Sequence, residues 1–343
     1  MSQDLKFGLD TFGDVTVDAE GRRLHQAQVI RDVVEEGVLA DQVGVDAFGV
    51  GEHHRDDYAV SSPDMVLAAI AARSHRIALG SAVTVLSSDD PIRVYERFAT
   101  LDAVSSGRAE ITLGRGSFIE SFPLFGFKLE DYEVLFTEKV ELFARIRKEA
   151  PVTWKGKTRP PLTDAQVYPT TERGGIPTWI GVGGTPESVV RAARYGFNLA
   201  LAIIGGEPAR FKPFVDLYHR ALEEFGHPSL PVAVHSPGFV ADTDDDAREQ
   251  LYPHFKANRD RIGRERGWGP TSRADYDREV EQGAVFAGSP ETVAQKIADT
   301  VRVLGVQRFD LKYSNGPLPH GQLMRCIELY GTQVIPRVRE LLA

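Results

Sequence analysis

The chain has 343 residues, 42% of them hydrophobic and 26% charged, which is the balance of a folded globular protein rather than a disordered one. With 40 Lys and Arg residues against 49 Asp and Glu residues, the formal net charge is −9, which argues against a protein that binds nucleic acids or anionic membranes. The single cysteine, Cys326, excludes disulfides and cysteine-rich metal sites within one chain. The N-terminal residues do not resemble a signal peptide, and no apolar stretch approaches the roughly 18 residues of a membrane-spanning helix. We therefore expect a cytoplasmic protein.

Short runs of apolar and β-branched residues recur along the chain and predict eight β-strands. Most runs are almost continuously apolar, which is typical of parallel strands that are covered on both faces. The eight runs are Lys6–Asp10, Ala47–Gly51, Ile77–Leu86, Ala109–Gly114, Thr178–Gly183, Asn198–Ile203, Pro231–Val240 and Arg308–Tyr313.

Amphipathic segments between these runs predict helices. Apolar residues recur every three or four positions around residues 30–38 and 323–341. Further helices are expected at about 64–73, 91–105, 131–149, 186–196, 208–226, 244–262 and 290–304. Eight strand-then-helix units in a chain of this length predict one α/β domain over residues 1–343, a (β/α)8 TIM barrel. An open, doubly wound sheet is the alternative.

Two segments, at about 151–177 and 263–289, are longer than the loops that usually connect such units. The first contains five prolines, and the second contains Trp268, Gly269 and Pro270. Long insertions in barrels commonly form lids or interfaces. We expect the second insertion to close over the site.

The motif Gly51-Glu52-His53-His54 lies at the end of the second expected strand. Active sites of barrels lie at the C-terminal ends of strands, and a histidine there can exchange a proton near neutral pH. Adjacent strand residues point to opposite faces, so the two imidazoles are not expected to share a metal ion. The alternative is that both are polar loop residues, or that one orders the other.

A glycine-rich turn, Gly181–Ser188, runs from the fifth expected strand into a helix. Its glycines allow a ligand to approach the backbone closely, and the helix start favours an anion such as phosphate. The similar segment Gly288–Val293 is a rival anion site, and both are expected to begin with a hydroxyl N-cap, Thr185 and Ser289. Well-capped helices after tight turns would give the same pattern.

Two further strand ends could border a ligand. In Leu113–Ser117, an arginine between glycines could bind a phosphate with its guanidinium fork, or could be a surface residue in a flexible turn. Small side chains in Gly80–Leu86 leave room for a flat ring, although a tightly packed barrel interior gives the same pattern. Asp10 ends the first expected strand and could reach the same pocket.

These motifs together resemble the bacterial luciferase-like, flavin-dependent monooxygenases. Each stretch is weakly specific alone, but they occur in the family's order and span nearly the whole chain. The stretches that carry the resemblance are Gly44–His54, Arg76–Val83, Pro91–Gly116, Gly183–Ser188 and Gly288–Val293.

The resemblance implies a flavin at the C-terminal mouth of the barrel. His53 aligns with the family's catalytic histidine, and His54 would lie behind it. A non-proline cis peptide between Ala82 and Val83 would lie beside the flavin ring. Residues that the resemblance places at the cofactor are Ala82, Val83, Thr84, Arg115, Gly116, Ser117, Gly183, Gly184, Thr185 and Ser188. Of these, the ones that would hold the FMN phosphate are Arg115, Ser117, Gly184, Thr185 and Ser188.

The implied activity is that of a two-component monooxygenase. A separate flavin reductase would supply reduced FMN, and O2 would oxygenate a small organic substrate through a flavin-4a-peroxide. The resemblance also suggests a homodimer. Gly114 stands where luciferase has a reactive cysteine and Gly184 where it has a glutamate, which argues against light emission. The alternatives are a deazaflavin-dependent hydride-transfer oxidoreductase and a non-catalytic flavin-binding protein.

Overall fold

Eight parallel strands close into a barrel in the computed structural model, which describes residues 5–18, 20–116 and 118–343. The first and last strands pair directly, with Lys6 opposite Arg308, so the eight strands leave no free edge. The barrel strands, in order around the barrel, are β1 (Lys6–Thr11), β2 (Ala47–Val50), β3 (Ala78–Ser81), β5 (Ala109–Gly114), β8 (Thr178–Val182), β9 (Asn198–Ala202), β10 (Val232–Val240) and β12 (Arg308–Lys312). The predicted (β/α)8 barrel is confirmed, and the open sheet is excluded.

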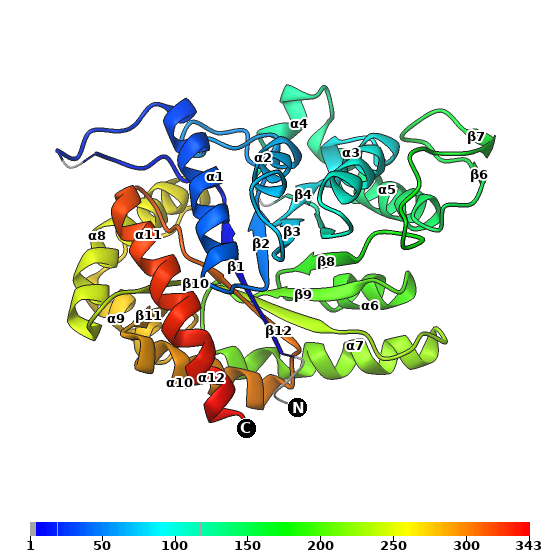
Figure 1. The fold of residues 1–343 in the computed structure, drawn as a ribbon. Helices are drawn as coiled ribbons and strands as arrows, with labels where there is room; N and C mark the ends of the chain where they lie inside the picture. The colour runs from blue at the N-terminus through cyan, green and yellow to red at the C-terminus, as the bar shows by residue number, and fades with distance from the viewer. Residues whose placement is uncertain (1–4, 19, 117) are drawn as a thin grey trace.

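Helices surround the barrel, and most lie where the apolar periodicity predicts them (Figure 1). The short α4, which follows β5, lies at the top of Figure 1. The helices are α1 (Gln26–Gln42), α2 (Pro63–Ala71), α3 (Pro91–Val104), α4 (Ser121–Leu124), α5 (Tyr132–Ile146), α6 (Pro186–Arg194), α7 (Lys212–Glu224), α8 (Asp244–Arg266), α9 (Arg273–Glu281), α10 (Pro290–Leu304), α11 (His320–Leu329) and α12 (Ile335–Leu341).

The single strand expected over Ile77–Leu86 is wrong, because the structure interrupts it. β3 ends at Ser81, and a two-residue strand, β4 (Thr84–Val85), pairs separately with β5. Between them lies a cis peptide bond, Ala82–Val83, at the position that the family resemblance implied. A short 3-10 turn (Leu86–Ser88) follows β4.

Both long insertions contain regular structure. The first forms an antiparallel pair, β6 (Val152–Trp154) and β7 (Leu162–Ala165). Most of the second is the end of α8, then α9, then an unpredicted strand, β11 (Phe286–Gly288), that pairs in parallel with the last residues of β10. Three residues are too few for a hydrophobic pattern to mark β11 as a strand.

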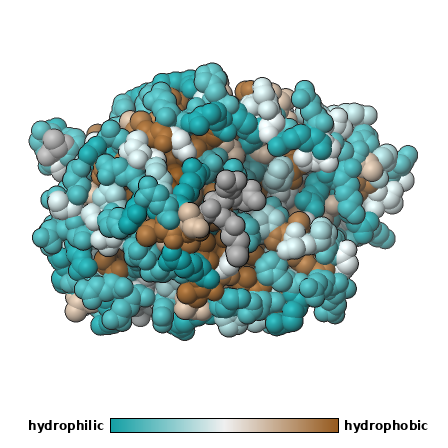
Figure 2. Space-filling model, turned by 60° about the horizontal axis from the view of Figure 1, so that its bottom comes forward, coloured by the Kyte–Doolittle hydropathy of each residue, from teal (hydrophilic) through white to brown (hydrophobic). Residues whose placement is uncertain are grey.

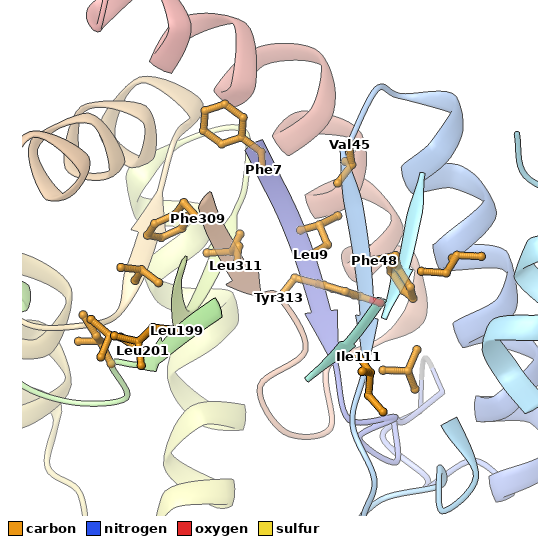
Figure 3. Close-up of a cluster of buried hydrophobic side chains, with 14 of the residues drawn as sticks. Phe7, Leu9, Val45, Phe48, Ile111, Leu199, Leu201, Phe309, Leu311 and Tyr313 are labelled. Atoms are coloured by element: carbon orange, nitrogen blue, oxygen red, sulfur yellow. The ribbon is translucent and has the colours of Figure 1, made fainter. Parts of the chain in front are cut away.

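Large apolar side chains on the outer face of the strands form the core against the helices. Phe7 and Phe309, both fully buried, face the surrounding helices (Figure 3). Because side chains alternate along a strand, the residues on either side of each outward-facing residue face into the barrel. Many of these inner residues are glycine or alanine, such as Gly49, Gly80 and Ala200, and they border a cavity.

Hydrophilic side chains cover most of the face shown in Figure 2, and hydrophobic surface forms separate patches, several of them near its centre. No helix within the described residues combines the length and apolar character needed to cross a bilayer.

Candidate active site

A cavity of about 380 Å³ lies inside the barrel, and every barrel strand contributes to its lining. Six of the predicted site residues line it: His53, Ala82, Val83, Arg115, Gly116 and Gly183. His54, Thr84, Gly184, Thr185 and Ser188 lie outside this lining, and Ser117 lies outside the described residues. The cavity therefore joins the motifs that follow β2, β3, β5 and β8.

Glycines keep this cavity open. A Cβ atom on Gly49 would lie 1.9 Å from Oδ1 of Asp10, and one on Gly114 would lie 2.4 Å from Cγ2 of Val83. Both distances are too short for real atoms, so larger residues there would displace the cavity wall. The glycine at position 114 thus provides space that a cysteine would fill.

His53 lies in an aromatic cage at the cavity wall. Its ring centroid is 4.8 Å from that of Phe12, 4.4 Å from that of Tyr58 and 5.1 Å from that of Phe118. Burial, and then the nearby positive charges, lowers the pKa of His53 to about 3. At neutral pH the imidazole is therefore uncharged, and it can donate one hydrogen bond and accept another.

His54 points away from this cavity and is held by Glu52. Its Nε2 donates to Oε1 of Glu52 over 2.9 Å, while Oε2 of Glu52 accepts from the backbone N–H of Val85, also over 2.9 Å. Glu52 is buried and lines the cavity, whereas His54 borders a neighbouring pocket that also includes Thr84. The pair thus fixes the loop after β2 against β4.

Two arginines, Arg115 just after β5 and Arg191 within α6, converge on one carboxylate. Arg115 forms an ion pair with Glu133, and Nη2 of Arg191 is 3.4 Å from Oε2 of the same carboxylate. Nη1 of Arg191 is buried and has no hydrogen-bond partner in the described part of the chain. Sequence reasoning missed Arg191, although it lies three residues after Ser188 and so on the same face of the helix.

The start of α6 is open to a ligand, and this corrects the expected hydroxyl cap. Thr185 occupies the N-cap position, but its Oγ1 donates to Oγ of Ser188 over 2.8 Å and does not cap the helix. A Cβ on Gly183 would meet no atom within 4 Å, and Gly184 has φ of +112°. Helix N–H groups and a glycine backbone are thus available to an anion.

The rival anion site at the start of α10 is already filled. Ser289 caps this helix as expected. The carboxylate of Asp244 accepts from the backbone N–H of Ser289 over 2.6 Å and from Oγ1 of Thr292 over 2.9 Å. Since a carboxylate occupies the place of the anion, the geometry favours α6 over α10 as a phosphate site.

Across the barrel from these loops, charged side chains line the cavity. Nδ1 of His235, on β10, donates to Oδ2 of Asp10, on β1, over 2.6 Å. Nε of Arg308 donates to Oδ1 of Asp310 over 2.6 Å, and the same guanidinium pairs with Glu110. Burial raises the pKa of Asp310. Sequence reasoning had noted only Asp10 in this group.

The end of α8 packs beside the cavity mouth. Nη2 of Arg55, just after His54, is 2.7 Å from Oε1 of Glu265, and Nε of Arg261 is 3.1 Å from Oδ2 of Asp57. The expected closure of residues 263–289 over the site stays a prediction.

A family model described as luciferase-like monooxygenase matches residues 11–308. The chain belongs to the luciferase-like monooxygenase family. Monooxygenases are oxidoreductases, so the chain is an enzyme of that class.

Two relatives illustrate its sequence neighbourhood. The chain is 26% identical to the uncharacterized protein y4vJ of Sinorhizobium fredii, over 94% of this chain and 96% of that protein. It is 26% identical to the N-acetyl-S-alkylcysteine monooxygenase of Bacillus subtilis, over 79% of this chain and 83% of that enzyme.

Solved structures share the fold across nearly the full length. The monooxygenase RslO1 from Streptomyces bottropensis has a TM-score of 0.83 and 23% identity, covering 97% of this chain and 99% of that one. The oxygenating constituent of 3,6-diketocamphane monooxygenase from Pseudomonas putida, in complex with FMN, has a TM-score of 0.76 and 19% identity, covering 97% and 98%. An F420-dependent secondary alcohol dehydrogenase also has a TM-score of 0.76, with 18% identity, covering 97% and 99%.

Proposed function

We propose that the protein is the oxygenating component of a two-component, FMN-dependent monooxygenase. It would take reduced FMN from a separate flavin reductase and use O2 to oxygenate a small organic substrate. The observation that carries this proposal is the anion-ready cluster beside the cavity: Arg115, the unpaired Nη1 of Arg191 and the open start of α6. This cluster lies next to a ring-sized space walled by Ala82 and Val83.

The residues present fit an FMN phosphate. Two guanidiniums provide charge-assisted hydrogen bonds, and the helix start adds backbone N–H groups and the hydroxyls of Thr185 and Ser188. A phosphate there would take over the contacts that Glu133 now makes with both arginines. Because Glu133 is 62% exposed, its carboxylate can move into water at little energetic cost.

When bound, FMN would supply the redox chemistry with O2, and the protein would supply orientation, a dry pocket and hydrogen bonds. The rings of Phe12, Tyr58 and Phe118 pack around His53 and shield part of its imidazole from water. A neutral His53 would hold its proton on one ring nitrogen and accept a hydrogen bond at the other. Glu52 would position the loop that carries His53, through His54 and Val85.

An F420-dependent hydride-transfer enzyme is the second candidate, favoured by the structural likeness to the F420-dependent alcohol dehydrogenase. The experiment that separates the two is an anaerobic titration with reduced FMN and, in parallel, with reduced F420. Rapid mixing with oxygenated buffer then measures O2 uptake.

Tight binding of reduced FMN, with O2 uptake that yields an oxygenated substrate rather than hydrogen peroxide, supports the monooxygenase. Preference for reduced F420, without O2 uptake, supports hydride transfer. Binding of FMN with only release of hydrogen peroxide, for every substrate tried, supports a flavin-binding protein without catalytic function.

A further inference from the structure

The cavity has two chemically different walls. Strands β5 and β8, which carry the anion-ready cluster, lie opposite β12 and β1 in the barrel order (Figure 1). A cofactor whose phosphate is held after β5 and β8 therefore leaves the wall of β10, β12 and β1 facing the remaining space. Asp10, His235, Arg308 and Asp310 line that wall.

On this wall, His235 is oriented with one nitrogen available. Its Nδ1 is engaged by Asp10 at 2.6 Å, and its ring stacks on Phe12 with centroids 6.1 Å apart and an angle of 9° between the planes. No described residue bonds to its Nε2, and the residue lines the cavity. When the imidazole is neutral, Nε2 accepts from a hydroxyl, and when it is protonated, Nε2 donates to a carbonyl oxygen.

The charge on the cavity lining disfavours anions. Among the described residues that line the cavity, Asp10, Glu52, Glu110 and Asp310 contribute four carboxyl groups, whereas Arg115 and Arg308 contribute two guanidiniums. Arg308, the guanidinium on the β10–β1 wall, is already engaged by Asp310 and Glu110. Bringing a carboxylate or sulfonate of a substrate beside these groups places like charges together, which costs binding free energy. An uncharged polar group meets no such penalty.

We propose that the β10–β1 wall is the substrate subsite, where the His235–Asp10 pair binds the oxygen of an uncharged carbonyl or hydroxyl compound. The assignment of substrate to this wall rests on the proposed function, which places the cofactor on the opposite one. The subsite selects ketones, aldehydes or alcohols and excludes carboxylates and sulfonates.

The test compares three probes on one carbon skeleton: cyclohexanone, cyclohexanol and cyclohexanecarboxylate. Binding is measured by calorimetry and saturation-transfer NMR, on the full chain with and without FMN. We expect the carboxylate to bind at least about tenfold more weakly than either neutral probe. The ratio of ketone to alcohol affinity shows which of the two the imidazole prefers.

The variants isolate the His–carboxylate pair. His235→Phe keeps a ring on Phe12 and removes Nε2, so neutral probes should bind about tenfold more weakly. Asp10→Asn keeps the shape and removes a charge, so the carboxylate probe should gain affinity. His320→Phe is the matched control, because Nδ1 of His320 makes the same kind of bond to Oε1 of Glu36, at 2.9 Å, away from the cavity.

Equal affinity of the ketone and the carboxylate for the wild-type protein overturns the proposal. So does an equal loss of binding in His235→Phe and His320→Phe, or the absence of binding of both neutral probes to a folded protein that binds FMN. If the neutral probes bind as expected but FMN does not, the proposed cofactor fails while the polar subsite stands.

Discussion

Replacing Arg115 with alanine tests the anion-ready cluster most directly. The side chain of Arg115 is 27% exposed and pairs with a carboxylate that is itself 62% exposed. Such an ion pair contributes only about 0–1 kcal/mol to folding, so the variant should fold normally. Arg115→Ala therefore separates cofactor binding from stability.

The expected loss in FMN affinity follows from the contact that is removed. A charge-assisted contact between a guanidinium and a phosphate in a partly shielded site contributes about 2–4 kcal/mol. This corresponds to a Kd for FMN that rises roughly 30-fold to 1,000-fold. Lysine at the same position keeps the charge but loses the planar fork, so the FMN affinity of Arg115→Lys should lie between those of the wild-type protein and Arg115→Ala.

Riboflavin provides the control, because it has the same ring and no phosphate. We expect wild-type protein to bind riboflavin far more weakly than FMN, and Arg115→Ala to leave riboflavin affinity almost unchanged. Both ligands can be followed by quenching of flavin fluorescence, and the four affinities form a thermodynamic cycle. An equal loss for the two ligands would mean that Arg115 shapes the cavity rather than binding phosphate, and no loss for either would remove it from the site.

Four further perturbations have defined outcomes. Glu133→Gln removes a negative charge beside the proposed phosphate site, so FMN should bind about threefold more tightly at low salt. About 1 M salt should abolish this gain, and calorimetry measures both affinities. Gly114→Ala places a Cβ 2.4 Å from Cγ2 of Val83, so urea denaturation should show an unfolding free energy lower by about 1–3 kcal/mol and titration a weaker FMN affinity. Burial lowers the pKa of His53 to about 3 in the folded protein, whereas its unfolded value is about 6.5. Between these pH values, the unfolding free energy of the wild-type protein should fall with pH relative to that of His53→Gln, by about 1.4 kcal/mol per pH unit. Unfolding free energies that change equally with pH in the two proteins would refute this. A hydrogen bond to the Glu36 carboxylate raises the pKa of His320. The stability that this bond adds should therefore be complete below about pH 6.5 and lost as the pH rises through the pKa of the folded protein. A loss of unfolding free energy in His320→Gln that grows with pH would contradict this sign.

The barrel was predictable because its strands are unbroken apolar runs and its helices have apolar residues at every third or fourth position. The interruption between β3 and β4 was hidden, since residues on both sides of Ala82–Val83 are equally apolar. The loops of the anion-ready cluster could be found from glycines and helix starts, which are local signals. Even so, the open start of α6 and the filled start of α10 have similar sequences, and only Asp244, over 40 residues before Ser289, distinguishes them.

The opposite wall could not be predicted in the same way. His235 and Asp10 are 225 residues apart in the sequence, and neither lies in a recognisable motif. Their contact depends on the closure of the sheet, in which β10 and β1 lie on either side of β12. Arg191 was missed for a smaller reason, because it follows the glycine-rich turn by one helical turn.

The glycine and alanine residues that face into the barrel have a thermodynamic consequence. In many barrels, branched aliphatic side chains fill the interior in layers, whereas here part of that volume is the cavity itself. A ligand that enters it completes the packing of the protein, so ligand binding and folding stability are linked. Melting temperature should then rise with the concentration of any true occupant, cofactor or substrate. Thermal shift can thereby rank candidate ligands before any reaction is known.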